Sequence, residues 1–128
     1  MPLYRFALRE GSSTEAQRAQ IAKDLVRIHC GVTGAPPSFV HAFFDESPPD
    51  ALPDGKAAFV LGSIRWGRTD AQKAEIVSKL THSVSDALGL DAAEVAVVTV
   101  DIPSRWNMEG GELLPEPGEE EAWLARHR

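Results

Sequence analysis

The residue most able to do acid–base chemistry is Pro2, the second residue of the chain. A small second residue normally leads to removal of the preceding methionine, so we expect Met1 to be lost and Pro2 to carry a free amine. An α-amine has a reference pKa of about 7.7–8.0, and burial or a nearby positive charge lowers that pKa. Pro2 is therefore a candidate general acid or base, although many chains begin Met-Pro without catalytic use of the proline.

Two arginines could bind a carboxylate group. Arg65 and Arg68 lie three residues apart on a short turn between an expected strand and an expected helix. Loops at strand ends are where α/β sheets bind ligands, and a planar guanidinium matches a carboxylate. The pair could bind and polarise an organic acid. The alternative is two solvated arginines at the surface.

His29 and Glu109 complete the candidate set. His29 falls in the last turn of an expected helix, where the helix dipole favours histidine, and a structural role is the alternative. Glu109 precedes two glycines in a turn, where its carboxylate could deprotonate a water molecule or simply face solvent. The other three histidines (41, 82 and 127) suggest only surface or packing roles, and the acidic residues 119–121 are expected to face solvent.

The elements that must position these residues recur in two similar halves. Residues 14–21 (TEAQRAQI) match residues 69–76 (TDAQKAEI) with an offset of 55 positions, and the same offset pairs Gly34 with Gly89. Apolar residues at helical spacing predict amphipathic helices over residues 15–30 and 69–88. Strands are expected at residues 3–8, 39–44, 57–64 and 95–102.

This duplicated β-α-β pattern predicts an α/β (α+β) fold with a four-stranded, mainly parallel sheet and both helices on one face. We expect one domain over residues 1–128, with repeats at about 2–46 and 57–102 and a C-terminal arm at 103–128. Residues 95–102 are almost all apolar, so we expect that strand to be buried on both faces. The uncovered sheet face of so small a chain needs a partner, which predicts a homo-oligomer.

The composition argues against several classes of protein. The 128-residue chain has a formal net charge of −6, which disfavours nucleic acid or an anionic membrane as the main partner. It has neither an apolar run of transmembrane length nor a signal-peptide pattern at its start. Cys30 is the only cysteine, so we expect no disulfide and a cytoplasmic location. No histidine pair has metal-ligand spacing, so we expect no metal site.

Taken together, the chain resembles the tautomerase superfamily and, within it, the cis-3-chloroacrylic acid dehalogenase group. The resemblance covers nearly the whole chain. It is carried by Pro2, residues 29–34 (HCGVTG), the Arg65-x-x-Arg68 pair, and Glu109 ahead of residues 114–118 (LPEPG). It implies a tautomerase-like fold, assembly as a trimer or hexamer, and a cofactor-free reaction on a small carboxylic acid. The roles it implies are proton transfer at substrate carbon by Pro2, carboxylate binding by His29, Arg65 and Arg68, and water activation by Glu109.

One position departs from the dehalogenase pattern. Those enzymes carry a tyrosine on the strand before the final turn, where this chain has Val98. One lost donor to developing charge can lower a rate by about 10²–10³. We therefore expect a keto-enol tautomerase with weaker hydratase or cis-3-haloacrylate dehalogenase activity. A malonate-semialdehyde-type decarboxylase is the nearest alternative, and a non-catalytic binding module that kept the fold is the alternative from a different class.

Overall fold

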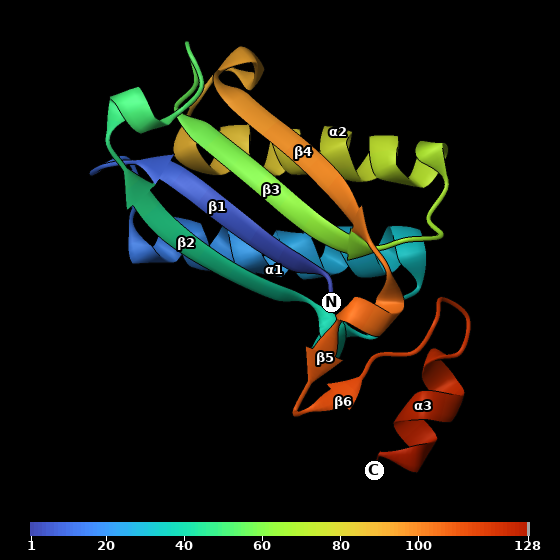
Figure 1. The fold of residues 1–128 in the computed structure, drawn as a ribbon. Helices are drawn as coiled ribbons and strands as arrows, with labels where there is room; N and C mark the ends of the chain where they lie inside the picture. Colours follow the sequence, from blue (N-terminus) through green and yellow to red (C-terminus); the bar gives the residue numbers. More distant parts are fainter. Residues whose placement is uncertain (128) are drawn as a thin grey trace.

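The structure is a computed structural model that describes residues 1–127 (Figure 1). It contains a four-stranded sheet, two long helices, a short hairpin and a C-terminal helix. In chain order the elements are β1 (Leu3–Arg9), α1 (Glu15–Thr33), β2 (His41–Ser47), β3 (Ala58–Arg65), α2 (Asp70–Leu88), β4 (Val95–Ile102), β5 (Met108–Glu109), β6 (Glu112–Leu113) and α3 (Glu120–Arg126).

The outer strand pairs of the main sheet are parallel, and the central pair is antiparallel. In the order β2-β1-β3-β4, the parallel pairs start at Leu3↔His41 and Ala58↔Val95. Because β1 and β3 run in opposite directions, the start of β1 lies beside the end of β3. Each parallel pair is joined through one helix, so the predicted duplicated β-α-β fold is confirmed.

The helices α1 and α2 begin and end in the same way, as the internal repeat requires. Each has 19 residues, a threonine cap with a glutamine three residues on that completes a capping box, and a left-handed glycine at its end. The sequence predicts a stop near Gly31 or Gly34, and α1 ends at the second of these glycines. The capping threonine, the capping-box glutamine and the final glycine are Thr14, Gln17 and Gly34 for α1, and Thr69, Gln72 and Gly89 for α2.

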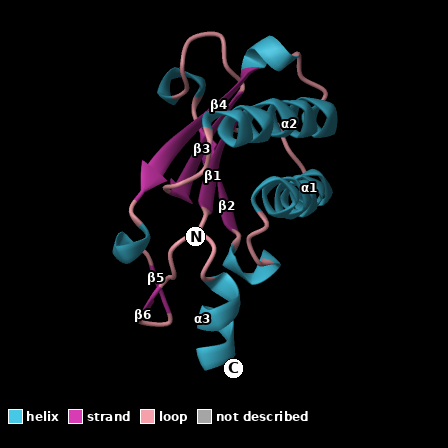
Figure 2. Cartoon of the chain, turned by 90° about the vertical axis from the view of Figure 1, so that its right-hand side faces the viewer, coloured by secondary structure: helices cyan, strands magenta, loops and turns pink. Residues whose placement is uncertain are grey.

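The hydrophobic core lies between the sheet and these two helices, which cover the same face (Figure 2). Alternate residues of β1 and β3 meet one apolar stripe from each helix, and burial of each large side chain stabilises the fold by about 1.5–3 kcal/mol. Fully buried members include Tyr4, Phe6, Val60, Ile64, Ile21, Leu25, Ile76 and Leu80. None of the helices within residues 1–127 is long and apolar enough to cross a membrane.

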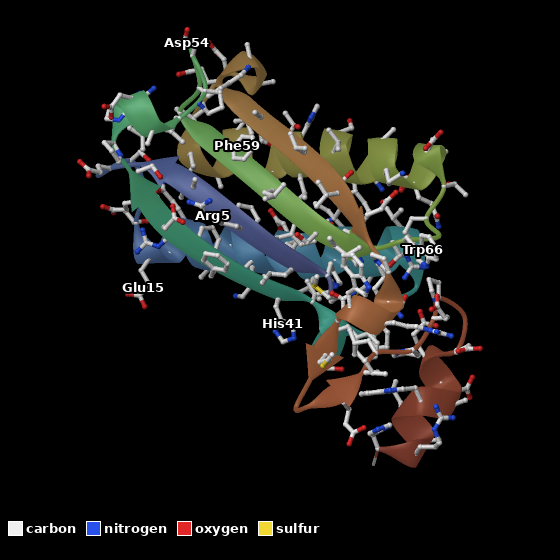
Figure 3. All side chains as sticks on the ribbon, viewed as in Figure 1. Arg5, Glu15, His41, Asp54, Phe59 and Trp66 are labelled. Carbon is white, nitrogen blue, oxygen red and sulfur yellow. The ribbon has the colours of Figure 1, made fainter. Side chains whose placement is uncertain are left out.

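The other face of the sheet is uncovered within the chain, and Arg5 and Phe59 lie on it (Figure 3). Phe43, Val98 and Val100 are exposed there by 46%, 43% and 39%. The prediction that residues 95–102 are buried on both faces is therefore wrong for the single chain. β4 is an edge strand, and its valines on the uncovered face meet no helix.

The C-terminal segment packs beyond one end of the sheet. Gly110 and Gly111, with φ angles of 59° and 82°, turn the chain between β5 and β6. In α3, Trp123 packs edge-on against Phe39 with ring centroids 5.6 Å apart, and its indole N–H donates to the Leu113 carbonyl at 2.7 Å. The expected C-terminal arm is thus a hairpin and a helix held against the sheet end where β1 begins.

Candidate active site

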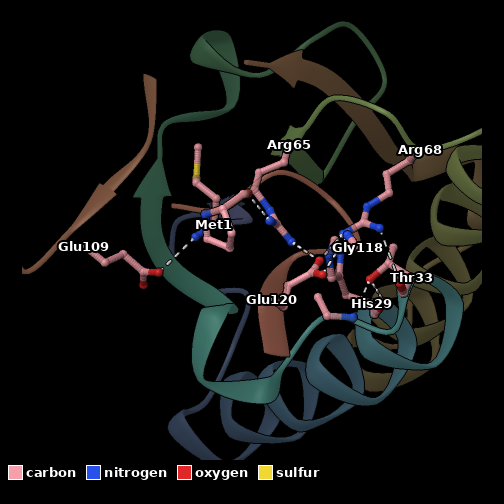
Figure 4. Close-up of polar contacts among 10 residues, drawn as sticks. Met1, His29, Thr33, Arg65, Arg68, Glu109, Gly118 and Glu120 are labelled. Atoms are coloured by element: carbon pink, nitrogen blue, oxygen red, sulfur yellow. Dashed lines mark hydrogen bonds and ion pairs between the residues drawn. The ribbon is translucent and has the colours of Figure 1, made fainter. Parts of the chain in front are cut away.

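The predicted site residues meet at a single end of the sheet. β1 begins there, β3 ends there, and α1 ends there, which brings Pro2, Arg65 and His29 into one region. Figure 4 shows Met1, Arg65 and His29 in this region. Arg68 follows β3, and Glu109 enters from β5. The positive charges of Arg68, Arg65 and the chain's amino terminus all act on the pKa of His29, so these groups form one electrostatic cluster.

The amino terminus faces Glu109. Pro2 is buried, and its nitrogen is an amide because Met1 precedes it. The terminal amine belongs to Met1 and lies 3.5 Å from Oε2 of Glu109. Burial lowers the pKa of this amine below its ordinary value, Glu109 opposes that shift, and the charge of Arg65 adds to it. An amine at this position therefore loses its proton more readily than an amine in water.

Arg65 is anchored inside the protein, with its side chain only 1% exposed. Its Nη1–H donates to the Pro115 carbonyl at 2.6 Å, and its Nη2–H donates to Oε1 of Glu120 at 2.8 Å. The guanidinium also stacks over the Phe39 ring, 5.4 Å from its centroid. These contacts fix the guanidinium in place, so Arg65 is not a solvated surface arginine.

Glu120 joins the two arginines, and the expectation that residues 119–121 all face solvent is wrong for it. Its side chain is 15% exposed, and Oε1 lies 3.7 Å from Nη2 of Arg68 as well as bonding Arg65. Partial burial acts to raise the pKa of Glu120, but hydrogen bonds from Arg65 and the Gly118 amide hold it below its usual range. Arg68 also donates to the Thr33 carbonyl at 3.3 Å. No local pattern distinguishes Glu120 from its acidic neighbours, since its partners lie 55 and 52 residues away.

His29 is buried and uncharged at neutral pH. It is 1% exposed, and its Nδ1 is hydrogen-bonded to the Tyr4 hydroxyl at 2.9 Å. Burial, assisted by the charges of Arg68 and Arg65, lowers the pKa of His29 to about 3. A neutral imidazole can donate one hydrogen bond and accept another, but it brings no charge of its own.

Tyr4 reaches His29 because residue 62, opposite it on β3, is a glycine. A Cβ atom built on Gly62 would lie 2.5 Å from Cε1 of the Tyr4 ring, closer than atoms can approach. Sequence reasoning assigned no role to Tyr4. Its alternation with Phe6 could have placed it on the helix-facing side of β1, toward the histidine at the end of α1.

His41 is a second residue that sequence reasoning missed. Its Nε2 is hydrogen-bonded to Oε1 of Glu109, and its backbone N–H donates to the Pro2 carbonyl at 3.0 Å. The two side chains are 68 residues apart in sequence and belong to no shared motif. The surface role expected for His41 therefore gives way to direct contact with a predicted site residue.

The region thus combines an amine, two carboxylates, two guanidinium groups and the neutral imidazole of His29, which suits proton transfer on an anionic substrate. Within residues 1–127, no group of three or more histidine, cysteine, aspartate or glutamate side chains is placed to hold a metal ion. A surface groove between α1 and α2, next to Asp24 and Lys79, contains none of the site residues.

Comparisons with known proteins agree with this architecture. A family model described as "Tautomerase enzyme" matches residues 63–114. The "Probable tautomerase bsl7456" of Bradyrhizobium diazoefficiens is 37% identical over 54 residues, which cover 42% of this chain and 81% of that protein.

Solved structures extend the similarity to the whole chain. The structure of "N1, a member of cis-3-chloroacrylic acid dehalogenase (cis-CaaD) family" is 34% identical, with a TM-score of 0.89, and covers 97% of this chain and 91% of that one. A "fused 4-OT wild type symmetric trimer" is 30% identical, with a TM-score of 0.78, and covers 88% of this chain and 95% of that one. With its paired β-α-β units and this similarity, the chain belongs to the tautomerase superfamily, in the cis-3-chloroacrylic acid dehalogenase-like group.

Proposed function

We propose that this chain is a cofactor-free enzyme that uses the amine of Pro2 as a general acid and base on small unsaturated or 2-oxo carboxylic acids. One observation carries the proposal: the terminal amine, the Glu109 carboxylate and the guanidinium groups of Arg65 and Arg68 meet at one end of the sheet. Membership of an enzyme superfamily of tautomerases supports the same class of reaction.

The arginine pair suits an anionic substrate. Arg65 and Arg68 carry two positive charges and Glu120 one negative charge, which leaves one positive charge for a substrate carboxylate. Each terminal nitrogen of Arg65 also keeps a second N–H that its present bonds do not use. If Tyr4 donates to Nδ1 of His29, the imidazole carries its proton on Nε2 and can donate from there. We assign carboxylate binding to these two arginines and His29.

Removal of Met1 would make the Pro2 nitrogen the terminal amine. Met1 fills the position between Pro2 and Glu109, so its loss would leave room beside both groups for a substrate of a few carbons. The burial and the Arg65 charge that lower the pKa of the Met1 amine would act on the Pro2 amine as well. In its neutral form, this amine takes the proton from an enol hydroxyl and then returns it to carbon, which gives the keto acid.

Addition of water to a double bond would use Pro2 and Glu109 together. Binding of the carboxylate draws electrons away from the β-carbon and makes it electrophilic. Glu109 takes a proton from water as the water oxygen bonds to that carbon, and the electrons of the double bond take the prolyl ammonium proton at the α-carbon. With a halogen on the β-carbon, the resulting 3-halo-3-hydroxy acid loses hydrogen halide and becomes an aldehyde.

We also propose a homotrimer. The uncovered face of the sheet holds Phe43, Val98 and Val100, whose exposure a partner would remove. The relative that is 30% identical and forms a symmetric trimer supports this assembly.

Intact mass before and after incubation with an acetylenic 2-oxo acid tests the proposal. We expect a mass without Met1, and one adduct per chain that maps to Pro2 because a neutral amine attacks the alkyne. The Pro2→Ala variant should lose turnover of enol acids while keeping its circular dichroism spectrum.

A matched control is a variant in which one residue before Pro2 is not removed. Its proline is unchanged, but the proline nitrogen stays an amide. It should take no label at Pro2. Turnover that is unchanged in Pro2→Ala would contradict the role of Pro2. A processed chain that takes no label and turns over no enol acid would favour a non-catalytic binding module.

A further inference from the structure

His41 connects the two groups that the proposed hydration needs. It is the first residue of β2, and parallel pairing places it opposite Leu3, next to the start of β1. Its backbone N–H donates to the Pro2 carbonyl at 3.0 Å, and its ring Nε2 bonds Oε1 of Glu109. A single residue thus contacts the backbone carbonyl of the residue proposed to carry the amine and the carboxylate of the proposed base.

Glu109 depends on this contact because its own backbone is lightly held. It lies on a two-residue strand paired only with β6, at the tip of a hairpin that turns through two glycines. Among residues 1–127, its side chain bonds His41 through Oε1 and the Met1 amine through Oε2. Loss of Met1 would remove the second contact and leave His41 as the anchor.

The backbone of His41, by contrast, is firmly placed. The preceding turn (Pro37–Phe39) is closed by the Val40 N–H, which donates to the Pro37 carbonyl, and Phe39 is buried. The His41 ring is 53% exposed, and the Glu109 side chain is 26% exposed. When His41 donates from Nε2 to Oε1, Oε2 of Glu109 stays free to take a proton from water.

We propose that His41 is a positioning residue that holds Glu109 in place to activate water, an inference that rests on the proposed function. This role belongs only to the hydration and dehalogenation reactions, because enol-to-keto conversion uses Pro2 without Glu109. From the start of β2, His41 supplies an N–H donor to the Glu109 carboxylate that would activate water.

The test compares two reactions in each variant, the hydration of an acetylenic or haloacrylic acid and the ketonisation of an enol acid. In His41→Leu we expect kcat for hydration to fall about 10- to 100-fold, the usual effect of losing a hydrogen bond to a charged group. KM for hydration and both constants for ketonisation should stay within about twofold. His41→Gln should restore most of the hydration, because its amide N–H reaches about as far as Nε2.

The control is His82→Leu, an exposed histidine on α2, which should change neither reaction. An equal loss of both reactions in His41→Leu would overturn the proposal, because it would point to the backbone at Pro2. Unchanged hydration would overturn it as well. A parent chain without Pro2-dependent ketonisation would instead contradict the proposed function.

Nitrogen NMR of histidine-labelled protein tests the contact without turnover. We expect His41 to carry its proton on Nε2 and its signals to shift in Glu109→Leu. The control Glu112→Leu removes the carboxylate opposite Glu109 on the hairpin, and it should shift His127, which lies 3.6 Å from Glu112, but not His41. His41 signals that are the same in Glu109→Leu and the parent chain would overturn the proposed contact.

Discussion

At the scale of single residues, the site depends on a glycine that takes no part in any chemistry. Gly62 leaves room for the Tyr4 ring, and the Tyr4 hydroxyl holds His29. Tyr4 is fully buried, so its ring has little freedom to move away from a new side chain.

We expect Gly62→Ala to lower the free energy of unfolding by about 1–3 kcal/mol, because the added methyl group overlaps the Tyr4 ring and forces it to shift. Urea unfolding at a fixed protein concentration measures the effect. The control is Gly31→Ala on α1, where a Cβ meets nothing within 4 Å. That change should raise the free energy of unfolding by about 0.5–1 kcal/mol, because alanine favours a helix. Equal effects of the two changes would show that Tyr4 is not confined.

At the scale of elements, the start of α2 holds Arg68 in place. Thr69 caps this helix directly after Arg68, and the capping glutamine, Gln72, also donates to the Val32 carbonyl at the end of α1. Thr14 caps α1 by the same arrangement, but at the opposite end of the sheet from the site. The repeat therefore provides a matched pair of caps.

We expect Thr14→Ala and Thr69→Ala each to lower the free energy of unfolding by about 1 kcal/mol. Only Thr69→Ala should raise KM for carboxylic acids, by up to about fivefold, because only that cap adjoins an arginine that we propose binds the substrate carboxylate. Steady-state kinetics with an enol acid, beside thermal unfolding, separates the two effects. A rise in KM for both variants would show that the loss comes from general destabilisation.

Sequence patterns predicted the elements better than the contacts of the site. The offset between Thr14 and Thr69, together with the two stop glycines, specifies both helices because capping is local chemistry. The contacts of Glu120 and His41 could not be predicted in this way. They join residues 55 and 68 positions apart, and only the packing of the C-terminal segment on the sheet end creates them.

At the scale of the whole molecule, the uncovered sheet face is the surface that we propose forms the trimer interface. Its exposed apolar side chains include Val98 and Val100 of the edge strand β4. The apolar sequence of β4 suggested burial on both faces, and a trimer that covers this face would reconcile that pattern with the single chain.

We expect Val100→Lys to shift the proposed trimer toward monomers, because burial of an unpaired ammonium at an interface costs several kcal/mol. Sedimentation velocity across a range of concentrations measures the shift. The control Ser78→Lys adds the same charge on the exposed side of α2 and should leave the assembly intact. A Val100→Lys trimer as tight as the parent would show that this face is not the interface.

The two halves of the chain are nearly equivalent in backbone, but only one sheet end carries reactive groups. The 55-residue offset relates Pro2 to Ala57, His29 to Val84 and Arg65 to Glu10. Fusing two copies of a β-α-β unit into one polypeptide leaves a single amino terminus, so the interior copy cannot offer a terminal amine. Under the proposed function, the sheet end of the interior copy then carries no catalytic group, and the chain has one reaction centre for its two structural units.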